Sequence, residues 1–191
     1  MTIIVKNISP KYGGNIGNDY NDYNDIIMTY GCATNIKSIT IKKIEIQSGG
    51  FVDNLQFTYN IVTLDGASHD YKGNKYGGNG GTKHDLIFND DEQPTRISGK
   101  YGDYIGSIVI KYLEIQTSQK TYTFGDRVNR IEDTAFNLPV GVIYGSCGGF
   151  LESIGSIMIA EAIQPTATAT VTATVTPAQP TITGLQQPLL D

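Results

Sequence analysis

Ser48-Gly49-Gly50-Phe51-Val52-Asp53 decides the fold, and it returns near the end of the chain as Cys147-Gly148-Gly149-Phe150-Leu151-Glu152. Each copy follows a β-branched run and precedes another apolar–polar alternation, which predicts two hairpin tips. The paired glycines allow a tight turn that exposes consecutive backbone N–H groups, and a carboxylate follows three residues later. Donors beside an acid suit a ligand made of hydroxyls, because each hydroxyl both donates and accepts. For one copy alone, a hairpin with a polar corner and no ligand is the simpler interpretation.

The composition favours strands and turns. Apolar residues make up 39% of the 191 residues, with 22 Gly and 12 Tyr, and Leu and Ala are scarce before the last thirty or so residues. We therefore expect one domain without a credible helix. The formal charge of −5 and the lack of a Lys/Arg cluster argue against nucleic acid as a partner.

The chain also repeats itself. The strict alternation over 36–47 recurs over 105–116, and Tyr12-Gly13-Gly14-Asn15-Ile16-Gly17 is echoed by Tyr76-Gly77-Gly78-Asn79-Gly80-Gly81. No helix follows either glycine run, which excludes a dinucleotide fingerprint. We expect further strands over 3–8, 55–64, 121–124 and 154–163, arranged in three related blocks. Such blocks are typical of a closed or pseudo-symmetric antiparallel architecture.

Several features suggest neither a metal, a cofactor nor a membrane. The acidic run 18–25 lacks the spacing of a calcium loop and is interpreted as a solvated loop. His69 and His84 are expected to be loop residues rather than metal ligands, and Cys32 and Cys147 to be free thiols. No apolar run approaches the ~20 residues of a membrane helix. No signal peptide is visible at the start, so the default is cytoplasmic, or export by an unrecognised route.

The composition changes at Gln164. Residues 164–191 are rich in Thr, Ala and Pro and carry no charge before Asp191. We expect a domain over 1–163 and a tail over 164–191. The tail is either a flexible linker or a segment that adds an edge strand to a neighbouring molecule.

The chain resembles the jacalin-related lectins, specifically their mannose-binding branch, over residues 3–163. The resemblance depends on the order and spacing of several motifs: the two Tyr-Gly-Gly-Asn runs, Gly49-Gly50-Phe51-Val52-Asp53, Ile97-Ser98-Gly99-Lys100-Tyr101-Gly102, Thr121-Tyr122-Thr123-Phe124-Gly125, Phe136-Asn137-Leu138-Pro139 and Gly148-Gly149-Phe150-Leu151-Glu152-Ser153-Ile154-Gly155. It implies an all-β fold, the β-prism, in which three four-stranded Greek-key sheets surround a pseudo-threefold axis.

The resemblance also implies two sugar sites, each pairing a GG loop with a G-x-x-x-acid loop. The main site would combine Gly50, Phe51, Asp53, Gly77 and Gly78. The second would combine Gly13, Gly14, Gly149, Phe150 and Glu152. In both, the acid would accept hydrogen bonds from two sugar hydroxyls while backbone N–H groups donate to the others.

Three departures from the family pattern qualify this expectation. Glu152 replaces the usual Asp, which puts the second site in doubt. The third block has Gly106 where an acid is expected, so no site is expected there, and Tyr12 replaces a tryptophan. Galactose-binding members depend on a cleaved chain, whereas the uncut chain here points to mannose or glucose.

The leading functional hypothesis is therefore a sugar-binding module that is not an enzyme and forms a homo-oligomer for avidity. Asp53 and Glu152 would lie in different sectors, unlike the paired acids of a glycosidase. The alternative is a structural or assembly protein on a lectin-like scaffold, with the tail docking on a neighbouring subunit.

Overall fold

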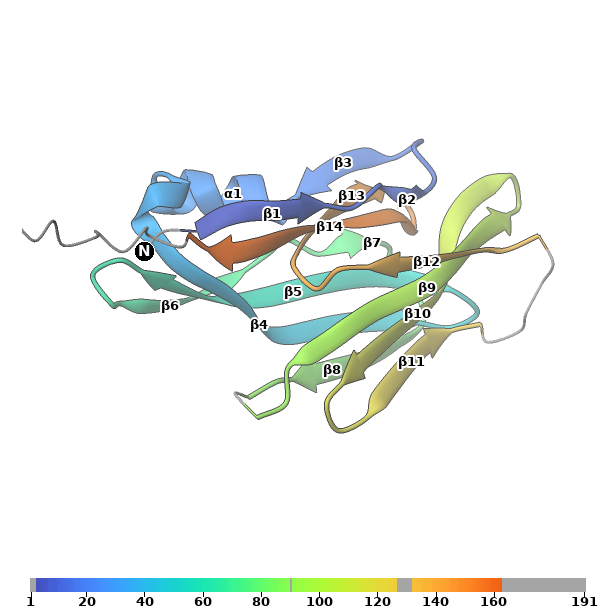
Figure 1. Ribbon diagram of the computed structural model, residues 1–191. Coiled ribbons are helices and arrows are strands. Elements are labelled where there is room, and N and C mark those ends of the chain that lie inside the picture. The colour runs from blue at the N-terminus through green and yellow to red at the C-terminus, as the bar shows by residue number, and fades with distance from the viewer. Residues whose placement is uncertain (1–2, 90, 127–131, 163–191) are drawn as a thin grey trace, which may run out of the picture.

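The computed structural model describes residues 3–89, 91–126 and 132–162, which form three antiparallel sheets (Figure 1). The strand orders are β1-β14-β13-β3 in the first sheet, β6-β5-β4-β8 in the second and β11-β10-β9-β12 in the third. The strands are β1 Ile3–Ile8, β2 Tyr12–Gly13, β3 Asn18–Asn21, β4 Ile36–Ser48, β5 Val52–Thr63, β6 Ser68–Lys72, β7 Tyr76–Gly77, β8 Thr82–Ile87, β9 Pro94–Tyr104, β10 Ser107–Thr117, β11 Thr121–Gly125, β12 Thr134–Leu138, β13 Val142–Cys147 and β14 Leu151–Glu161. The predicted all-β architecture of three sheets is confirmed.

Two details refine that prediction. The first sheet is assembled from both ends of the chain, since β1 and β3 pair with β14 and β13 (blue beside orange in Figure 1). The two-residue strands β2 and β7 pair with β14 and β5 respectively, so the first and second sheets each gain a short fifth strand. Both short strands belong to the glycine loops.

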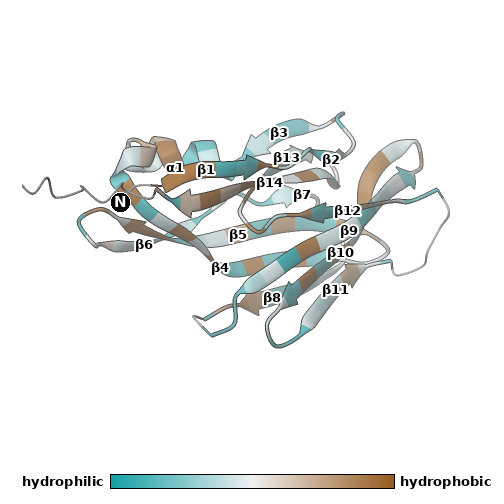
Figure 2. Ribbon diagram, viewed as in Figure 1, coloured by the Kyte–Doolittle hydropathy of each residue, from teal (hydrophilic) through white to brown (hydrophobic). Residues whose placement is uncertain are grey.

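The sheets share one apolar core. Apolar and polar residues mix along the long strands (Figure 2), and the burial of β4 and β10 largely alternates, while the first seven residues of β14 are all buried. The fully buried side chains include Ile44, Ile46, Leu55, Phe57, Ile110, Leu113, Ile115, Ile143, Leu151 and Ile154. A fully buried side chain of this kind contributes roughly 1.5–3 kcal/mol, and a slip of one residue would expose a whole face, so the register is firmly specified.

A bulge interrupts each long hairpin at a corresponding place. The register of β4 and β5 passes from Gln47↔Asn54 to Ser48↔Val52, which leaves Asp53 without a partner. The same shift leaves Glu152 unpaired in β14 and Lys111 unpaired in β10. A bulge bends the strand and redirects the side chain of the extra residue, and two of these three residues are the predicted sugar-binding acids.

The expectation that the chain has no credible helix is wrong. Helix α1 spans Asp22–Tyr30, and a 3-10 turn, η1, spans Ala33–Asn35. The Asn21 side chain caps α1 by accepting from the Asn24 N–H at 3.1 Å, and Gly31 ends it at φ 88°. Ile26, a residue of this helix, is fully buried in the core. Its packing offsets the poor helix propensity of the Asn and Asp residues in α1.

The interpretation of residues 18–25 as a solvated loop is therefore also wrong. Asn18–Asn21 form β3, which pairs with β13, and the helix follows at once. Asp22 is fully buried rather than solvated. Asn18, Asp19 and Asn24 stay exposed, so pairing with β13, together with burial of Tyr20 and Asp22, gives the first sheet its outer strand.

The histidines lie in strands, not in loops as predicted: His69 in β6 and His84 in β8. Among the described residues, no three His, Cys, Asp or Glu side chains cluster as metal ligands would. Cys32 and Cys147 are free thiols, as predicted. No helix within the described ranges is long and apolar enough to cross a membrane. The tail predicted over 164–191 lies outside the described residues.

Candidate functional site

The predicted main site forms where β7 meets the start of β5. Gly77 pairs with Asn54, and the Gly78 N–H donates to the Asp53 carbonyl oxygen at 2.9 Å. Gly77 has φ 109°, and a Cβ there would lie 2.1 Å from that same carbonyl oxygen. Only glycine permits this approach, so the backbone of the GG loop lies directly against that of Asp53.

The Asp53 carboxylate lies over the rest of that loop. A Cβ on Gly80 would lie 2.2 Å from Asp53 Oδ1, and one on Gly81 would lie 2.6 Å from Oδ2. Asp53 is 6% exposed, and burial raises its pKa. Its carboxylate makes no hydrogen bond to any described residue, and its oxygens are not among the buried unpaired atoms, so they remain accessible. Two acceptor oxygens are therefore held uncommitted beside bare glycine backbone.

The predicted second site repeats this geometry. The Gly14 N–H donates to the Glu152 carbonyl oxygen at 2.9 Å, and Gly13, with φ 121°, places its missing Cβ 2.1 Å from that oxygen. The difference lies in the side chain. Glu152 Oε2 accepts a hydrogen bond of 2.6 Å from the Gly17 N–H, so the longer acid is bound to its own loop.

The third sector repeats this backbone geometry, but a lysine stands where the other two sectors have an acid. Gly125, at φ 80°, places its missing Cβ 2.1 Å from the Lys111 carbonyl oxygen, which also accepts from the Asp126 N–H at 2.9 Å. Lys111 therefore occupies the place of Asp53 and Glu152. The assignment of Gly106 to that place is wrong, because the β9–β10 hairpin extends further beyond its bulge than the other two. Lys111 Nζ lies 3.0 Å from Asp133 Oδ1, and both side chains are buried.

Three aromatic rings, one from each sheet, meet beside the loops. The ring centroid of Phe51 lies 4.6 Å from that of Tyr104 and 4.7 Å from that of Phe150. The two predicted sites also touch, since a Cβ on Gly78 would lie 2.1 Å from the Gly149 carbonyl oxygen. The hairpin tips and glycine loops thus form one continuous end of the molecule.

All ten predicted site residues lie at this end. The prediction assigned them to two sites: Gly50, Phe51, Asp53, Gly77 and Gly78, and Gly13, Gly14, Gly149, Phe150 and Glu152. Backbone contacts join Gly77 and Gly78 to Asp53, and Gly13 and Gly14 to Glu152. Sequence reasoning missed Gly17, Gly80 and Gly81, although each lies in the repeated glycine run that the sequence displays. It also missed the buried Asp22, because the neighbouring Asn and Asp residues indicated a solvated loop.

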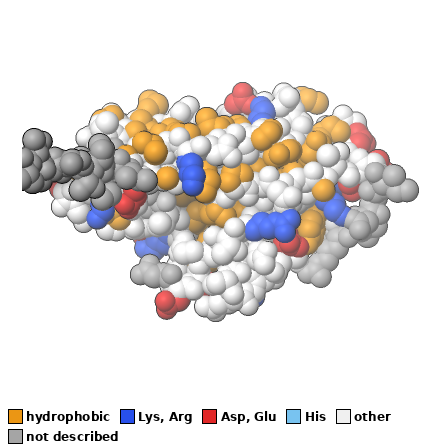
Figure 3. All heavy atoms as spheres, in the orientation of Figure 1, with side chains coloured by type: hydrophobic (Ala, Val, Ile, Leu, Met, Phe, Trp, Pro, Cys, Tyr) orange, Lys and Arg blue, Asp and Glu red, His pale blue; other side chains and the backbone are white. Residues whose placement is uncertain are grey.

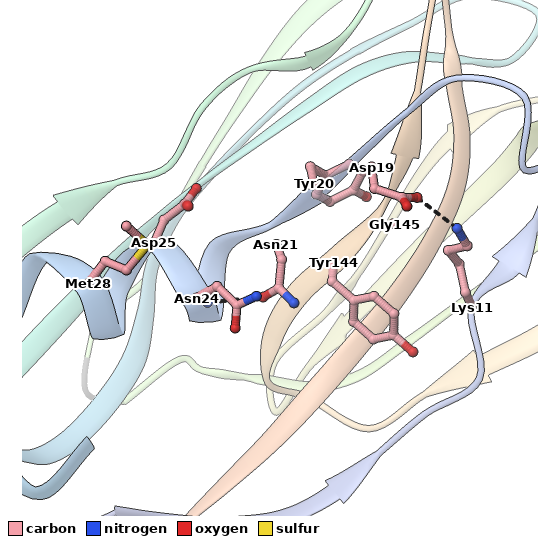
Figure 4. A pocket seen from close by; sticks show the side chains of 9 residues that line it. All are labelled: Lys11, Asp19, Tyr20, Asn21, Asn24, Asp25, Met28, Tyr144 and Gly145. Atoms are coloured by element: carbon pink, nitrogen blue, oxygen red, sulfur yellow. Dashed lines mark hydrogen bonds and ion pairs between the residues drawn. The ribbon is translucent and has the colours of Figure 1, made fainter. Parts of the chain in front are cut away.

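A separate depression of about 510 Å³ lies against α1, β3 and β13 (Figure 4). Its lining includes the Lys11–Asp19 ion pair, with 2.9 Å between Nζ and Oδ1, and the half-buried Tyr144. None of the ten predicted site residues lines it. On the face shown in Figure 3, charged side chains lie scattered among apolar and polar ones.

Comparison with known proteins identifies the family of this chain. The model of the jacalin-like lectin domain matches residues 9–157. Horcolin from Hordeum vulgare subsp. vulgare is 33% identical over 128 residues, which cover 62% of this chain and 82% of horcolin.

Solved structures share the fold. AcmJRL, described as a mannose binding jacalin related lectin from Ananas comosus, superposes with a TM-score of 0.60 at 25% identity, covering 82% of this chain and 98% of its own. Artocarpin in complex with mannopentose also gives a TM-score of 0.60, at 21% identity, over 81% of this chain and 97% of its own. The sequence matches show that this chain belongs to the jacalin-like lectin family of carbohydrate-binding proteins.

Proposed function

We propose that the protein binds mannose- or glucose-containing glycans, without catalysis, chiefly through the main site of Gly50, Phe51, Asp53, Gly77 and Gly78. The observation that carries the proposal is the Asp53 carboxylate. The residue is only 6% exposed, its carboxylate makes no hydrogen bond within the described residues, and its accessible oxygens lie against glycine backbone. A pair of sugar hydroxyls supplies the missing donors.

Each part of the main site has a role in such binding. The two Asp53 oxygens accept from two hydroxyls, and these charge-assisted bonds contribute ~1.5–3 kcal/mol each. Backbone N–H groups near Gly50 and Phe51 donate to ring and hydroxymethyl oxygens. The GG loop donates to the remaining hydroxyls. A single sugar in such an open site binds at ~millimolar strength, about −4 kcal/mol.

The second site, formed by Gly13, Gly14, Gly149, Phe150 and Glu152, binds more weakly in this proposal. Gly17 already donates to Glu152 Oε2, so a sugar must replace that bond or use only the other oxygen. The third sector offers a lysine bound to Asp133 instead of a carboxylate. We therefore propose one strong and one weak site per chain.

The preference for mannose or glucose is supported by the relatives. AcmJRL is described as mannose binding, and artocarpin was solved with mannopentose. A role without catalysis is supported by the placement of the acids, since Asp53 and Glu152 occupy bulges on different sheets, each beside its own loop. A glycosidase places two acids across one bond.

Homo-oligomers would give the avidity that one shallow site lacks. The edge strand β1 presents the exposed apolar residues Ile4, Val5 and Ile8, and such an edge favours pairing with another chain. The same observation favours the second candidate, an assembly protein on a lectin scaffold.

A glycan array separates the two functions. A lectin should prefer glycans that end in mannose or glucose, and free methyl-mannoside should compete with that binding while methyl-galactoside should not. Absence of any glycan signal, together with retained oligomer formation, would favour the assembly protein.

A further inference from the structure

We propose that Asp22 is a positioning residue for the main site: through Tyr76 it holds Gly77 and Gly78 in place beside Asp53, and sugar binding weakens when this link is broken. This inference rests on the proposed function and adds a residue that makes no contact with the sugar. It also gives a role to the helix that the sequence did not predict.

The link begins with a carboxyl group deep in the molecule. Asp22 is the first residue of α1 and is fully buried. Its Oδ2 accepts a hydrogen bond of 2.9 Å from the Tyr59 hydroxyl, and its Oδ1 accepts one from the Tyr76 hydroxyl. Gly73 leaves space for it, since a Cβ there would lie 2.8 Å from both oxygens. A charge in such a place binds its donors firmly.

Tyr76 carries the link to the main site. It is 6% exposed and belongs to β7, which has only two residues and pairs with β5 at only two positions. Its ring stacks on Tyr20 with 3.8 Å between the centroids. Gly77 and Gly78 follow at once and have no side chains to fix them. The loop is also held by the Gly78 N–H, which donates to the Asp53 carbonyl oxygen at 2.9 Å, and by Asn54 Nδ2, which donates to the Gly78 carbonyl oxygen at 2.7 Å. The two contacts of Tyr76 add the side-chain anchor that directly precedes the two glycines.

The second site provides an internal comparison. Tyr12 occupies the place of Tyr76 ahead of Gly13 and Gly14, and its ring lies 5.5 Å from Phe136. Its hydroxyl makes no hydrogen bond to any described residue. The buried acid thus supports only the site whose own acid, Asp53, is left uncommitted.

The surroundings of Asp22 make the link sensitive to pH. Burial raises the pKa of Asp22 to about 6, while the hydrogen bonds from Tyr76 and Tyr59 oppose the rise and Asp25 adds to it. The titratable groups that face it are Tyr20 from β3, Tyr59 from β5, Tyr71 from β6, Tyr76 from β7 and Asp25 from α1. Burial raises the pKa of all four tyrosines, so they stay neutral. When Asp22 gains a proton, it becomes a donor and a weaker acceptor for Tyr76.

Two tyrosine variants test the link with a matched control. Tyr76→Phe and Tyr59→Phe each remove one donor to the same carboxylate, but only Tyr76 adjoins the GG loop. Tyr59→Phe also leaves the Ile143 N–H without its acceptor, the Tyr59 hydroxyl oxygen 3.1 Å away. The free energy of unfolding should therefore fall at least as much in Tyr59→Phe as in Tyr76→Phe. We expect Tyr76→Phe to bind methyl-mannoside about tenfold more weakly in titration calorimetry, and Tyr59→Phe to bind like the parent. Equal losses in both variants, or no loss in Tyr76→Phe, would overturn the inference.

The pH dependence gives a second measurement. Between pH 5 and 7 the affinity of the parent should fall as the pH drops through about 6. Asp22→Asn keeps the volume but cannot titrate, so the inflection near pH 6 should be absent from its profile. An unchanged inflection in Asp22→Asn would contradict the link.

Amide hydrogen exchange needs no sugar and separates this inference from the proposed function. The Gly78 N–H, bonded to the Asp53 carbonyl oxygen, should exchange about tenfold faster in Tyr76→Phe than in Tyr59→Phe. If the Gly78 N–H exchanges faster in Tyr76→Phe but the parent binds no sugar, the proposed function is refuted and the link from Asp22 to the GG loop stands. Unchanged exchange with normal sugar binding would refute the link alone.

Discussion

Glu152 Oε2 accepts a hydrogen bond of 2.6 Å from the backbone amide of Gly17, 135 residues earlier in the chain. Asp53, the corresponding acid of the main site, makes no such bond to a described residue, although the carbonyl geometry of the two sites is the same. One methylene therefore decides whether the acid binds its own loop or remains available. The inequality of the two sites follows from this contact.

Shortening the second acid should open the second site. In Glu152→Asp the carboxylate no longer reaches the Gly17 amide, and the site takes the geometry of the main one. Calorimetry with methyl-mannoside should show either a stoichiometry close to two or a tighter second binding step. Glu152→Gln is the control, because it keeps the length and the contact with Gly17 and should not bind more tightly than the parent. A Glu152→Asp variant with unchanged binding would show that the Gly17 contact does not limit the site.

The ion pair of the third sector should contribute to stability and not to binding. Lys111→Met leaves the Asp133 carboxylate buried without its partner, which should lower the free energy of unfolding by ~3 kcal/mol. Adding Asp133→Asn should restore most of that loss, because the uncompensated charge is removed. Urea unfolding of the two single variants and the double variant measures the coupling. Additive losses would mean that the pair does not interact as the structure indicates.

The stability should depend on pH through Asp22. Its folded pKa of about 6 lies above the usual 3.8, so between these values the folded chain binds more protons than the unfolded chain. The free energy of unfolding that Asp22 contributes is therefore greatest near pH 4, falls as the pH rises to 6, and is level above. The fall amounts to ~3 kcal/mol at most.

Asp22→Asn isolates this contribution, since other carboxylates titrate in both proteins. Its stability minus that of the parent should rise between pH 4 and pH 7, as followed by thermal unfolding. The variant should therefore lose less stability than the parent between pH 4 and pH 7, while binding sugar less tightly at neutral pH. A constant difference across this range would contradict the burial of a charged Asp22.

Removing residues 164–191 should leave the melting temperature of the monomer nearly unchanged. Among the described residues, the last strand, β14, ends at Glu161, which pairs with Ile3, and the core cluster draws its buried residues from 3–154. Size-exclusion chromatography of the same truncation would show whether any oligomer depends on the tail. A large fall in the melting temperature would show that the tail belongs to the domain.

The strands could be predicted because their evidence is local. Period-two alternation over 36–47 and 105–116 places apolar side chains on one face, and β4 and β10 follow these ranges closely. The repeated motifs then indicated three related sheets. The assembly of the first sheet from both chain ends is a matter of long-range pairing, which alternation does not report.

Helix α1 could not be predicted with the same signals. Asn and Asp compete with the helical backbone and favour turns, so the run 18–25 has the composition of a loop. Burial of Ile26 and Asp22 against the sheets reverses that preference, and this burial is known only from the three-dimensional structure. The cap by Asn21 and the stop at Gly31 were visible but carry little weight alone.

The main site could be predicted only through the family resemblance. Nothing local connects Asp53 with Gly77 and Gly78, which become neighbours because β7 returns to β5. The third sector shows the limit of such reasoning. Counting along the sequence led to Gly106, whereas the bulge in β10 puts Lys111 in that place.

The central claim is that Asp53 is the main sugar-binding acid, and titration calorimetry of Asp53→Ala with methyl-mannoside tests it most directly. Asp53→Asn and Glu152→Ala serve as matched variants, with thermal unfolding as the control for folding. We predict that both Asp53 variants lose most of the binding with little change in melting temperature, while Glu152→Ala retains it. If Asp53→Ala binds like the parent and Glu152→Ala does not, the working site lies on the other hairpin and the account is wrong.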